Sequence, residues 1–415
     1  MKLDLTDMLY AMSFALDKVE EELLGIYTGH GKRVAYLALL MGKEAGFGEE
    51  ELRDFIGCCL LHDNALTEFI HDELSNSPMS RRLSTNLSEL AEGDRTKLDH
   101  DHSTMGEENI RLLPFRTDVR NIILHHHEHA DGSGALGLTA EETSLKAQIL
   151  HLADTADATC QFSIETITPE QFEELCAWVR SETGTLFSQE VVDLFFRAVT
   201  YERMARLQEK GLIPCLHEEL PRDVAEYSDE EIRRIANLFA RIVDYKSRYT
   251  QEHSRGVAEK AEIMARYYGF DEEKVIRFYF AGAMHDIGKL AIVNGILEKP
   301  GKLTTDEFAE MKHHSDATYF ILSQIKEIPD IVKWAANHHE KLNGGGYPQG
   351  LSGEELSFEE QLMACIDIYQ ALTEKRPYKD GFSHEKTISI MREMAARGEI
   401  NESIIGDIDR VMGPQ

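Results

Sequence analysis

The stretch SDEEIRRIANLFARIVDYKS (228–247) predicts the fold class of this chain. Ser228 followed three residues later by Glu231 is typical of a capping box, in which two side chains satisfy free backbone amides at the start of a helix. The apolar residues that then recur at helical spacing are Ile232, Ile235, Phe239, Ile242 and Val243. Such spacing recurs along nearly all of the chain and valine-rich alternating runs are scarce, so we expect an all-α protein.

The helix predicted at 228–247 leads into the second of two copies of one histidine and aspartate pattern. The earlier copy consists of His30, His62, Asp63, His102, His126, His127 and Asp154. The later copy consists of His253, His285, Asp286, His314, His338, His339 and Asp367. In both copies the first two histidines are 32 residues apart (62 − 30 and 285 − 253), and the third precedes the His-His pair by 24 (126 − 102 and 338 − 314). The matched spacing predicts a duplicated polynuclear metal site.

The duplication divides the 415-residue chain into two domains. Between the copies, GLIPCLHEELPRD (211–223) has two prolines and no clear hydrophobic period, which is typical of a linker. We therefore expect domain one at 1–210, a linker at 211–223 and domain two at 224–415. From the His-Asp pair to the third histidine, the first copy is 11 residues longer (40 against 29), and a polar surface loop within 75–96 is expected to hold them.

Composition limits the partners and the location of the protein. The 44 Lys and Arg residues against 74 Asp and Glu give a net charge of −30, which repels polyanions and argues against a nucleic-acid polymer as partner. The six cysteines form no CxxC motif, so reduced thiols in a cytosol are expected. The N-terminal stretch MKLDLTDMLYAMSFALDKVEEELLG (1–25) is broken by acids and reads as a helix rather than a signal peptide. We expect a cytoplasmic protein with no membrane partner.

Imidazole and carboxylate ligands suit first-row transition metals such as iron, manganese or zinc. An adjacent His-Asp pair lets one carboxylate bridge two ions while the histidine binds one of them. Two metals roughly 3.5–4 Å apart clamp a phosphodiester. Lys289 follows Asp286 by three residues, close to one helical turn, where its ammonium can hold phosphate oxygens. The first copy has Leu66 at that position.

The later copy resembles an HD-GYP domain, a subgroup of the HD phosphohydrolase superfamily. The motifs that carry the resemblance are YTQEHSRGVA (249–258), HDIGK (285–289), ILEKPGKLTTDEF (296–308), NHHEKLNGGGYPQGL (337–351) and IDIYQALTEKRPY (366–378). The resemblance implies hydrolysis of a cyclic dinucleotide, typically cyclic di-GMP, at a two- or three-metal centre of iron or manganese. It implies catalytic roles for Asp286 and Lys289, and substrate contacts for Lys289, Gly346, Tyr347 and Pro348.

The resemblance also assigns the metal ligands by position. One metal would be held by His253, His285 and Asp367, the other by His314, His338 and His339, with Asp286 bridging. Trinuclear members have a glutamate where this chain has Tyr249, so a binuclear centre is expected.

Four residues depart from the family pattern around the ligands: Ser315, Thr318, Asn343 and Gln370. None is a ligand by this interpretation, but such positions shape a pocket. The substrate therefore stays open between cyclic di-GMP and 3',3'-cyclic GMP-AMP. Glu340 is either a partner that orients a ligand histidine or an ordinary helix residue.

The earlier copy resembles a degenerate HD domain fused before an active one, as in some cyclic-dinucleotide phosphodiesterases. It keeps HHEHADGSG (126–134), but Ala135 and Leu136 replace the Tyr-Pro signature. We expect a helical domain without hydrolysis that packs on domain two and sets access to its active site; whether it binds metal is open. The alternatives are a non-catalytic nucleotide sensor and a general HD nucleotidase. A homodimer or a signalling-protein partner is also open.

Overall fold

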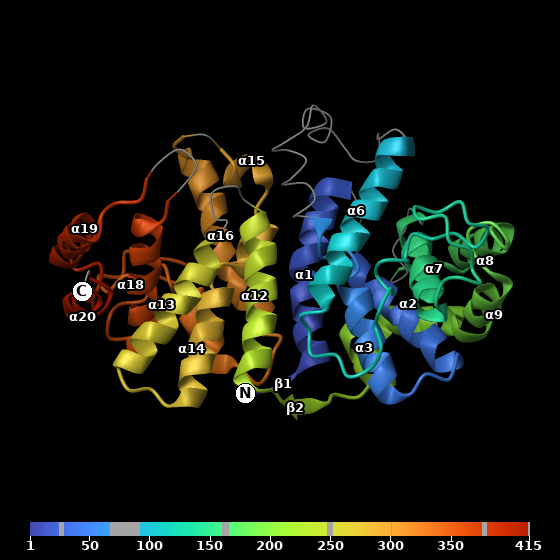
Figure 1. The fold of residues 1–415 in the computed structure, drawn as a ribbon, viewed down its shortest axis with the longest axis horizontal. Coiled ribbons are helices and arrows are strands. Elements are labelled where there is room, and N and C mark those ends of the chain that lie inside the picture. Colours follow the sequence, from blue (N-terminus) through green and yellow to red (C-terminus); the bar gives the residue numbers. More distant parts are fainter. Residues whose placement is uncertain are drawn as a thin grey trace. The chain divides into compact units, whose positions relative to one another are not determined.

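The computed structural model describes residues 1–24, 29–66, 92–159, 166–246, 252–299, 301–375 and 380–413. Over these residues, the chain is mostly helices joined by turns, and β1 (Lys2–Asp4) and β2 (Val224–Glu226) form a single two-stranded sheet (Figure 1). The predicted all-α class is confirmed. The described helices include none with the length and apolar character that a bilayer span needs.

The chain divides into two compact units, each with its own core. The N-terminal unit is Asp4–Val224, and the C-terminal unit is Ala225–Gln415 together with Met1–Leu3. Met1 joins the C-terminal unit because its amino group donates to the carbonyl oxygen of Tyr227 at 2.9 Å. The exact limits of the two predicted domains, 1–210 and 224–415, stay a prediction.

The N-terminal unit is built around α2 (His30–Glu44), which is buried from His30 to Gly42 and is therefore enclosed on all sides. Five helices pack on it: α1 (Leu5–Leu24), α3 (Glu49–Leu60), α7 (Leu145–Thr159), α9 (Gln189–Ala198) and α11 (Leu212–Glu219). The other helices among the described residues of this unit are α6 (Glu92–Ile110), α8 (Pro169–Ser181) and α10 (Tyr201–Lys210).

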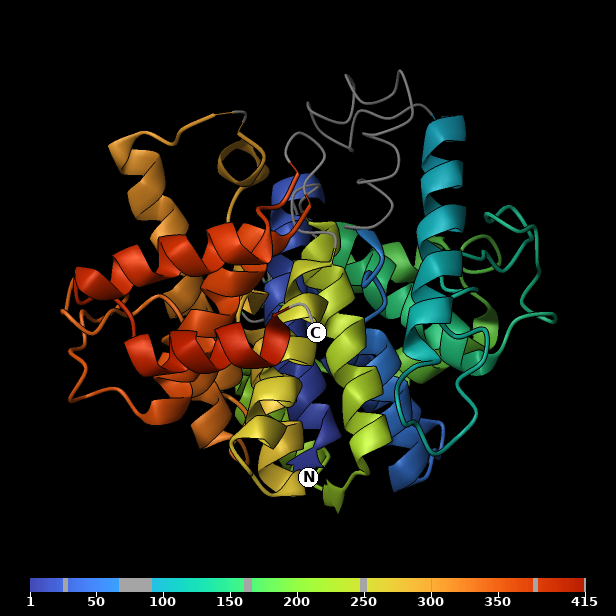
Figure 2. The ribbon, with the colours of Figure 1, turned by 60° about the vertical axis from the view of Figure 1, so that its left-hand side comes forward.

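In the C-terminal unit, α14 (Glu272–Met284) takes the central place. It contacts α12 (Asp229–Tyr245), α13 (His253–Tyr267) and α17 (Pro329–Ala336). The short η2 (Ile287–Ala291) and α15 (Asn294–Leu297) lead to α16 (Thr305–Leu322). Finally, α18 (Phe358–Thr373), α19 (His384–Ala396) and α20 (Glu402–Met412) pack together as the red helices of Figure 2.

Capping boxes fix the starts of three helices in this unit. The predicted box at Ser228 is present, and the five apolar residues predicted to share one face of α12 are all buried. Thr304 with Glu307 opens α16, and Ser357 with Glu360 opens α18. Each box satisfies two backbone amides that have no partner within the helix. The helices that carry His314 and Asp367 therefore begin at defined residues.

The predicted linker is not irregular, because Leu212–Glu219 form α11. Leu212, Cys215 and Leu216 are buried and follow a helical spacing that is only one turn long. Pro214 lies in the first turn, where the missing N–H needs no partner within the helix. The expectation of an aperiodic segment was wrong over these residues. Most of the polar loop predicted within 75–96 lies outside the described residues; from Glu92 the chain is helical.

Candidate metal centres

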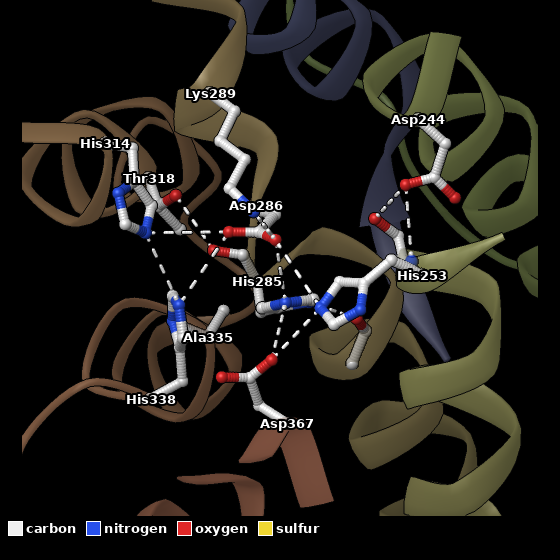
Figure 3. Close-up of polar contacts among 12 residues, drawn as sticks. Asp244, His253, His285, Asp286, Lys289, His314, Thr318, Ala335, His338 and Asp367 are labelled. Carbon is white, nitrogen blue, oxygen red and sulfur yellow. Dashed lines mark hydrogen bonds and ion pairs between the residues drawn. The ribbon is translucent and has the colours of Figure 1, made fainter. Parts of the chain in front are cut away.

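The seven predicted ligands of the C-terminal unit lie together, and Figure 3 shows all of them except His339. His253 is the first residue of α13, and the adjacent pair His285 and Asp286 directly follows α14. His314 comes from α16 and Asp367 from α18. His338 and His339 come directly after α17 and Asn337.

Asp286 presents its two carboxylate oxygens to two different pairs of histidines. Its Oδ2 atom lies 3.0 Å from His285 Nε2 and 3.8 Å from His253 Nε2. Its Oδ1 atom lies 3.5 Å from His314 Nε2 and 3.8 Å from His338 Nε2. This division of its oxygens suits a carboxylate that bridges two cations.

The remaining ligand atoms form two groups around Asp286. Asp367 Oδ1 lies 3.0 Å from His253 Nε2 and 3.7 Å from His285 Nε2, and these three residues form the first group. The second group is His314, His338 and His339. Within each group the ligand atoms lie within 4.8 Å of one another. His339 has a side chain that is 30% exposed, so the second group is the one that reaches the surface.

Backbone contacts select the tautomer that a metal requires. The Nδ1 atoms of His285, His314 and His338 lie 2.8, 2.7 and 2.6 Å from the carbonyl oxygen three residues earlier. Because a carbonyl oxygen only accepts, Nδ1 carries the proton and Nε2 keeps its lone pair. His285 Nε2 and Asp286 Oδ1 are buried without a hydrogen-bond partner. Such atoms are costly unless a ligand satisfies them, so the donor set fits a bound metal.

The charges of the cluster also suit cations. Burial alone would raise the pKa of Asp286, but His285 and Lys289 hold that pKa well below its usual range. Lys289 Nζ lies 2.5 Å from Asp286 Oδ2. Burial lowers the pKa of His339 to about 3, which leaves a neutral imidazole at physiological pH. Burial would also lower the pKa of His253, but hydrogen bonds to Asp367 and Glu374 raise it to about 9, so a metal there displaces a proton.

The N-terminal unit repeats this arrangement with its own predicted ligands. Asp63 places Oδ2 3.6 Å from His62 Nε2 and Oδ1 3.4 Å from His102 Nε2. Asp154 Oδ1 lies 3.0 Å from His30 Nε2 and 3.6 Å from His62 Nε2. The two groups of ligand atoms are His30, His62, Asp63 and His102, His126, His127. The structure thus brings together all seven residues of the earlier copy.

The N-terminal cluster also has unsatisfied imidazole nitrogens. The Nε2 atoms of His62 and His126 are buried without a hydrogen-bond partner, while their Nδ1 atoms lie 2.9 and 2.5 Å from backbone carbonyl oxygens. His102 Nε2 and His127 Nε2 approach each other to 3.1 Å. Leu66 is buried where the C-terminal unit has Lys289. The cluster therefore offers groups that could hold a metal, with an apolar side chain at the position that Lys289 has in the other unit.

The two units hold their first histidine with different carboxylates, which the sequence did not predict. Asp157 lies 2.8 Å from His30 Nδ1 and accepts from Arg33 Nε at 2.8 Å. In the C-terminal unit, Glu374 Oε2 lies 3.1 Å from His253 Nδ1.

This difference explains the departure at Gln370. Gln370 and Gly256 occupy the positions of Asp157 and Arg33, three residues after Asp367 and His253 respectively. A Cβ atom on Gly256 would lie 2.4 Å from the Gln370 side chain, so Gln370 occupies that space. Lys260 Nζ donates to Gln370 at 2.6 Å. The two changes are visible in the sequence, but their contact is not.

A buried aspartate on the preceding helix supports the start of each first-histidine helix. Asp244 accepts from Ser254 Oγ at 2.7 Å and from Ser254 N at 3.3 Å (Figure 3). Asp17 accepts from Gly31 N at 3.0 Å. Burial raises the pKa of Asp244 to about 7. The spacing from aspartate to histidine differs between the copies, which is why the repeat did not reveal these residues.

Glu340 has neither of the two roles left open by the sequence. Its buried carboxylate accepts from the backbone amides of Gln349, Gly350 and Leu351 at 2.7, 3.0 and 3.0 Å. Glu128 in the N-terminal unit accepts from Leu136 N at 2.7 Å and from a second amide of that loop at 2.6 Å. In both units, this glutamate anchors the loop that follows the His-His pair.

The anchored loop carries the predicted substrate residues. Tyr347 lies against the cluster, with its ring centroid 4.7 Å from that of His339. A Cβ atom on Gly346 would lie 2.5 Å from Glu340 Cα, so glycine is needed there for the loop to pack. Pro348 follows at a partly exposed position.

The other departures support backbone segments. Thr318 Oγ1 donates to His285 O at 3.0 Å and accepts from Gly288 N at 3.1 Å. Asn343 is exposed and accepts from Gly345 N at 2.9 Å within a turn. Ser315 Oγ lies 3.3 Å from His314 Nε2. Tyr249, which bears on the number of metals, lies outside the described residues.

Comparison with known families matches both units to the same description. Residues 27–159 match an HD domain, and residues 237–404 match a second HD-domain profile. The chain carries two HD domains in tandem. The N-terminal HD domain contains the first cluster of ligands, and the C-terminal HD domain contains the second.

Some named relatives align with both HD domains of this chain, and others align with less than half of it. The 3'3'-cGAMP-specific phosphodiesterase 1 of Vibrio cholerae is 28% identical over 98% of this chain and 91% of its own length. The cyclic di-GMP phosphodiesterase response regulator RpfG of Xanthomonas campestris is 34% identical over 41% of this chain and 46% of its own length. A crystal structure titled as the cyclic GMP-AMP specific phosphodiesterase V-cGAP3 of V. cholerae shares the fold, with a TM-score of 0.68, 23% identity and coverage of 100% and 99% of the two chains.

Proposed function

We propose that the chain is a metal-dependent phosphodiesterase that hydrolyses a cyclic dinucleotide to a linear dinucleotide in its C-terminal HD domain. The observation that carries this proposal is the bridging geometry of Asp286, whose oxygens face two separate groups of ligands beside Lys289. The names of the relatives support the substrate class.

The donor set favours two transition metals, iron or manganese. His253, His285 and Asp367 would hold one metal, and His314, His338 and His339 the other, with Asp286 shared. When bound, two such metals position a phosphodiester and supply Lewis acidity. The protein's own part is to fix the tautomer of His285, His314 and His338, so that their Nε2 lone pairs are free for a metal.

Lys289 is the residue that we assign to the phosphate. Its ammonium lies 2.5 Å from Asp286 Oδ2, and a buried cation there stabilises negative charge that develops on the phosphate oxygens. Burial alone would lower the pKa of Lys289, but Asp286 raises it, so the side chain stays charged. Tyr347 borders the more exposed group of ligands.

Between the two substrates left open, we propose 3',3'-cyclic GMP-AMP. The relative named for this nucleotide aligns along both HD domains, whereas the relative named for cyclic di-GMP aligns over less than half of the chain. The N-terminal HD domain, without lysine and tyrosine at the matching positions, is proposed to bind metal but not to hydrolyse the substrate. A cytoplasmic location is also our proposal, supported by five described cysteines that are buried and free.

The decisive experiment is turnover of a panel of cyclic dinucleotides by protein loaded anaerobically with iron or manganese. We expect a linear dinucleotide as product, with the highest kcat/KM for 3',3'-cyclic GMP-AMP. Metal-free protein serves as the control. A fully metal-loaded protein that cleaves none of the cyclic dinucleotides would contradict the proposed function.

A further inference from the structure

Two aromatic rings and a lysine form a corner beside the C-terminal metal ligands. Phe308 and Lys312 are four residues apart on α16, and Tyr347 belongs to the loop anchored by Glu340. The ring centroids of Phe308 and Tyr347 are 6.4 Å apart at an interplanar angle of 85°. Lys312 Nζ lies 4.9 Å from the Phe308 centroid and 5.3 Å from the Tyr347 centroid. We call Phe308, Lys312 and Tyr347 the aromatic corner.

The aromatic corner is continuous with the metal cluster. The Tyr347 ring centroid lies 4.7 Å from that of His339 and 6.2 Å from that of His314. His314 stands two residues after Lys312 on the same helix, so one element carries both a metal ligand and part of the corner. Tyr347 therefore lies between the His314 and His339 rings of the cluster and the Phe308 ring, so a ligand long enough to extend from the cluster past Tyr347 would meet Phe308.

The aromatic corner combines an exposed ring with a lysine that has no carboxylate partner among the described residues. The Phe308 side chain is 47% exposed although it adjoins a second ring. Among the described residues, no carboxylate oxygen pairs with Lys312, whereas Lys299 pairs with Glu307 of the same helix. In a chain with a net charge of −30, an unpaired lysine beside an exposed ring suits an anionic aromatic ligand.

The corner belongs to one HD domain only. Counting back from the third histidine places Thr96 and His100 of the N-terminal HD domain at the positions of Phe308 and Lys312. Ala135 stands at the position of Tyr347. The domain that lacks the phosphate-binding lysine therefore lacks all three residues of the corner as well.

We infer that the aromatic corner is the base-binding subsite of the C-terminal HD domain. Phe308 stacks on one purine of the cyclic dinucleotide, Tyr347 borders that base, and Lys312 pairs with the phosphate that is not cleaved. This inference rests on the proposed function. Its chemical basis is that aromatic rings stack on any base, and that a cyclic dinucleotide brings a second phosphate which Lys289 does not neutralise.

The test uses a cyclic dinucleotide that contains 2-aminopurine, whose fluorescence falls when the base stacks on a ring. The full-length, metal-loaded protein is mixed rapidly with this probe, and quenching is recorded before turnover. In Phe308→Ala we expect loss of quenching and a KM raised roughly 5- to 150-fold, the range that corresponds to one lost base–ring stack. Phe308→Trp should restore both, because it keeps a stacking face.

The matched control is Tyr319→Ala. Tyr319 is also an exposed aromatic residue of α16, 47% exposed, and lies 11 residues further along the helix. That separation is roughly 16 Å along the axis, too far to share the base. Lys312→Gln should raise KM and weaken its dependence on salt, and Lys312→Arg should retain the wild-type behaviour.

The outcomes separate this inference from the proposed function. One outcome is that the wild type quenches the probe fluorescence, Phe308→Ala does not, and neither protein hydrolyses any cyclic dinucleotide. This outcome would support the subsite and refute the activity. Hydrolysis with unchanged KM and quenching in Phe308→Ala would keep the activity and overturn the subsite. A wild-type protein that neither quenches nor hydrolyses would overturn both.

Discussion

Lys289 and Leu66 stand at the same place in two clusters whose metal ligands otherwise correspond. Each follows its aspartate by three residues, yet only Lys289 places a charge beside that aspartate. Leu66 is buried and apolar, so it cannot compensate a phosphate. At the scale of single residues, this difference distinguishes the domain to which we assign phosphate chemistry from the domain that keeps only the clustered histidines and aspartates.

Lys289→Ala should lower kcat roughly 100-fold or more. Loss of one preorganised donor to a charged transition state costs about 2.7–4 kcal/mol, which corresponds to that range of rates. Metal content should stay intact, because Lys289 is not a ligand. Steady-state kinetics and elemental analysis of the same preparation measure both. The control is Lys302→Ala, which replaces an exposed lysine. Unchanged kinetics in Lys289→Ala would show that Lys289 has no part in catalysis.

Asp286→Ala should remove metal from the C-terminal HD domain and abolish turnover. The two groups of ligands face this one carboxylate, so its loss leaves each metal site short of a donor. Elemental analysis should show a partial loss, because the N-terminal ligands are unchanged. Asp316→Ala, with an exposed carboxylate on α16, is the matched control. Full metal occupancy and activity in Asp286→Ala would refute the bridge.

At the scale of elements, the features that could be predicted from the sequence are those set by nearby residues or by repeated intervals. The capping box and buried face of α12 were predictable, because both depend on residues within a few positions of one another. The clustering of the two sets of histidines and aspartates was predictable because duplication preserved their intervals, and their role as metal ligands stays a prediction. Helix α11 was missed, since one turn of apolar spacing is too short to recognise beside two prolines.

Contacts that depend on the path of the backbone were also beyond prediction. Glu340 reaches amides nine to eleven residues ahead, and Glu374 reaches His253 across 121 positions. Neither contact follows from an interval within one element. The sequence can therefore name the histidines and aspartates that cluster in the site, but not the carboxylates that hold its loop and its first histidine in place.

Glu340→Ala should loosen the loop that carries Tyr347. Three backbone amides lose their acceptor, and an unsatisfied buried donor costs about 1–3 kcal/mol. We expect a lower free energy of unfolding and a higher KM, with metal content retained. Denaturant titration and kinetics measure these effects. Glu354→Ala, at an exposed position nearby in the sequence, is the control. If the two variants had the same free energy of unfolding and the same KM, the anchoring role of Glu340 would be refuted.

At the scale of the whole molecule, the chain holds two metal-ligand sets, each contained within one compact unit. No ligand of one cluster is supplied by the other unit among the described residues. Metal binding links several helices of a domain and stabilises the folded form by its own binding free energy. If the N-terminal HD domain does not hydrolyse, as we propose, this provides a physical reason for it to keep its cluster of histidines and aspartates.

The two clusters should therefore be separable by paired substitutions. We expect His285→Ala/Asp286→Ala to abolish hydrolysis and to lose only the metal of the C-terminal HD domain. His62→Ala/Asp63→Ala should lose only the metal of the N-terminal HD domain and keep most of the activity, because Leu66 and Ala135 leave that domain without the residues for phosphate and base. Turnover, elemental analysis and thermal unfolding of both variants in parallel measure this. Equal loss of activity in a well-folded His62→Ala/Asp63→Ala protein would mean that the N-terminal centre takes part in the chemistry or controls it.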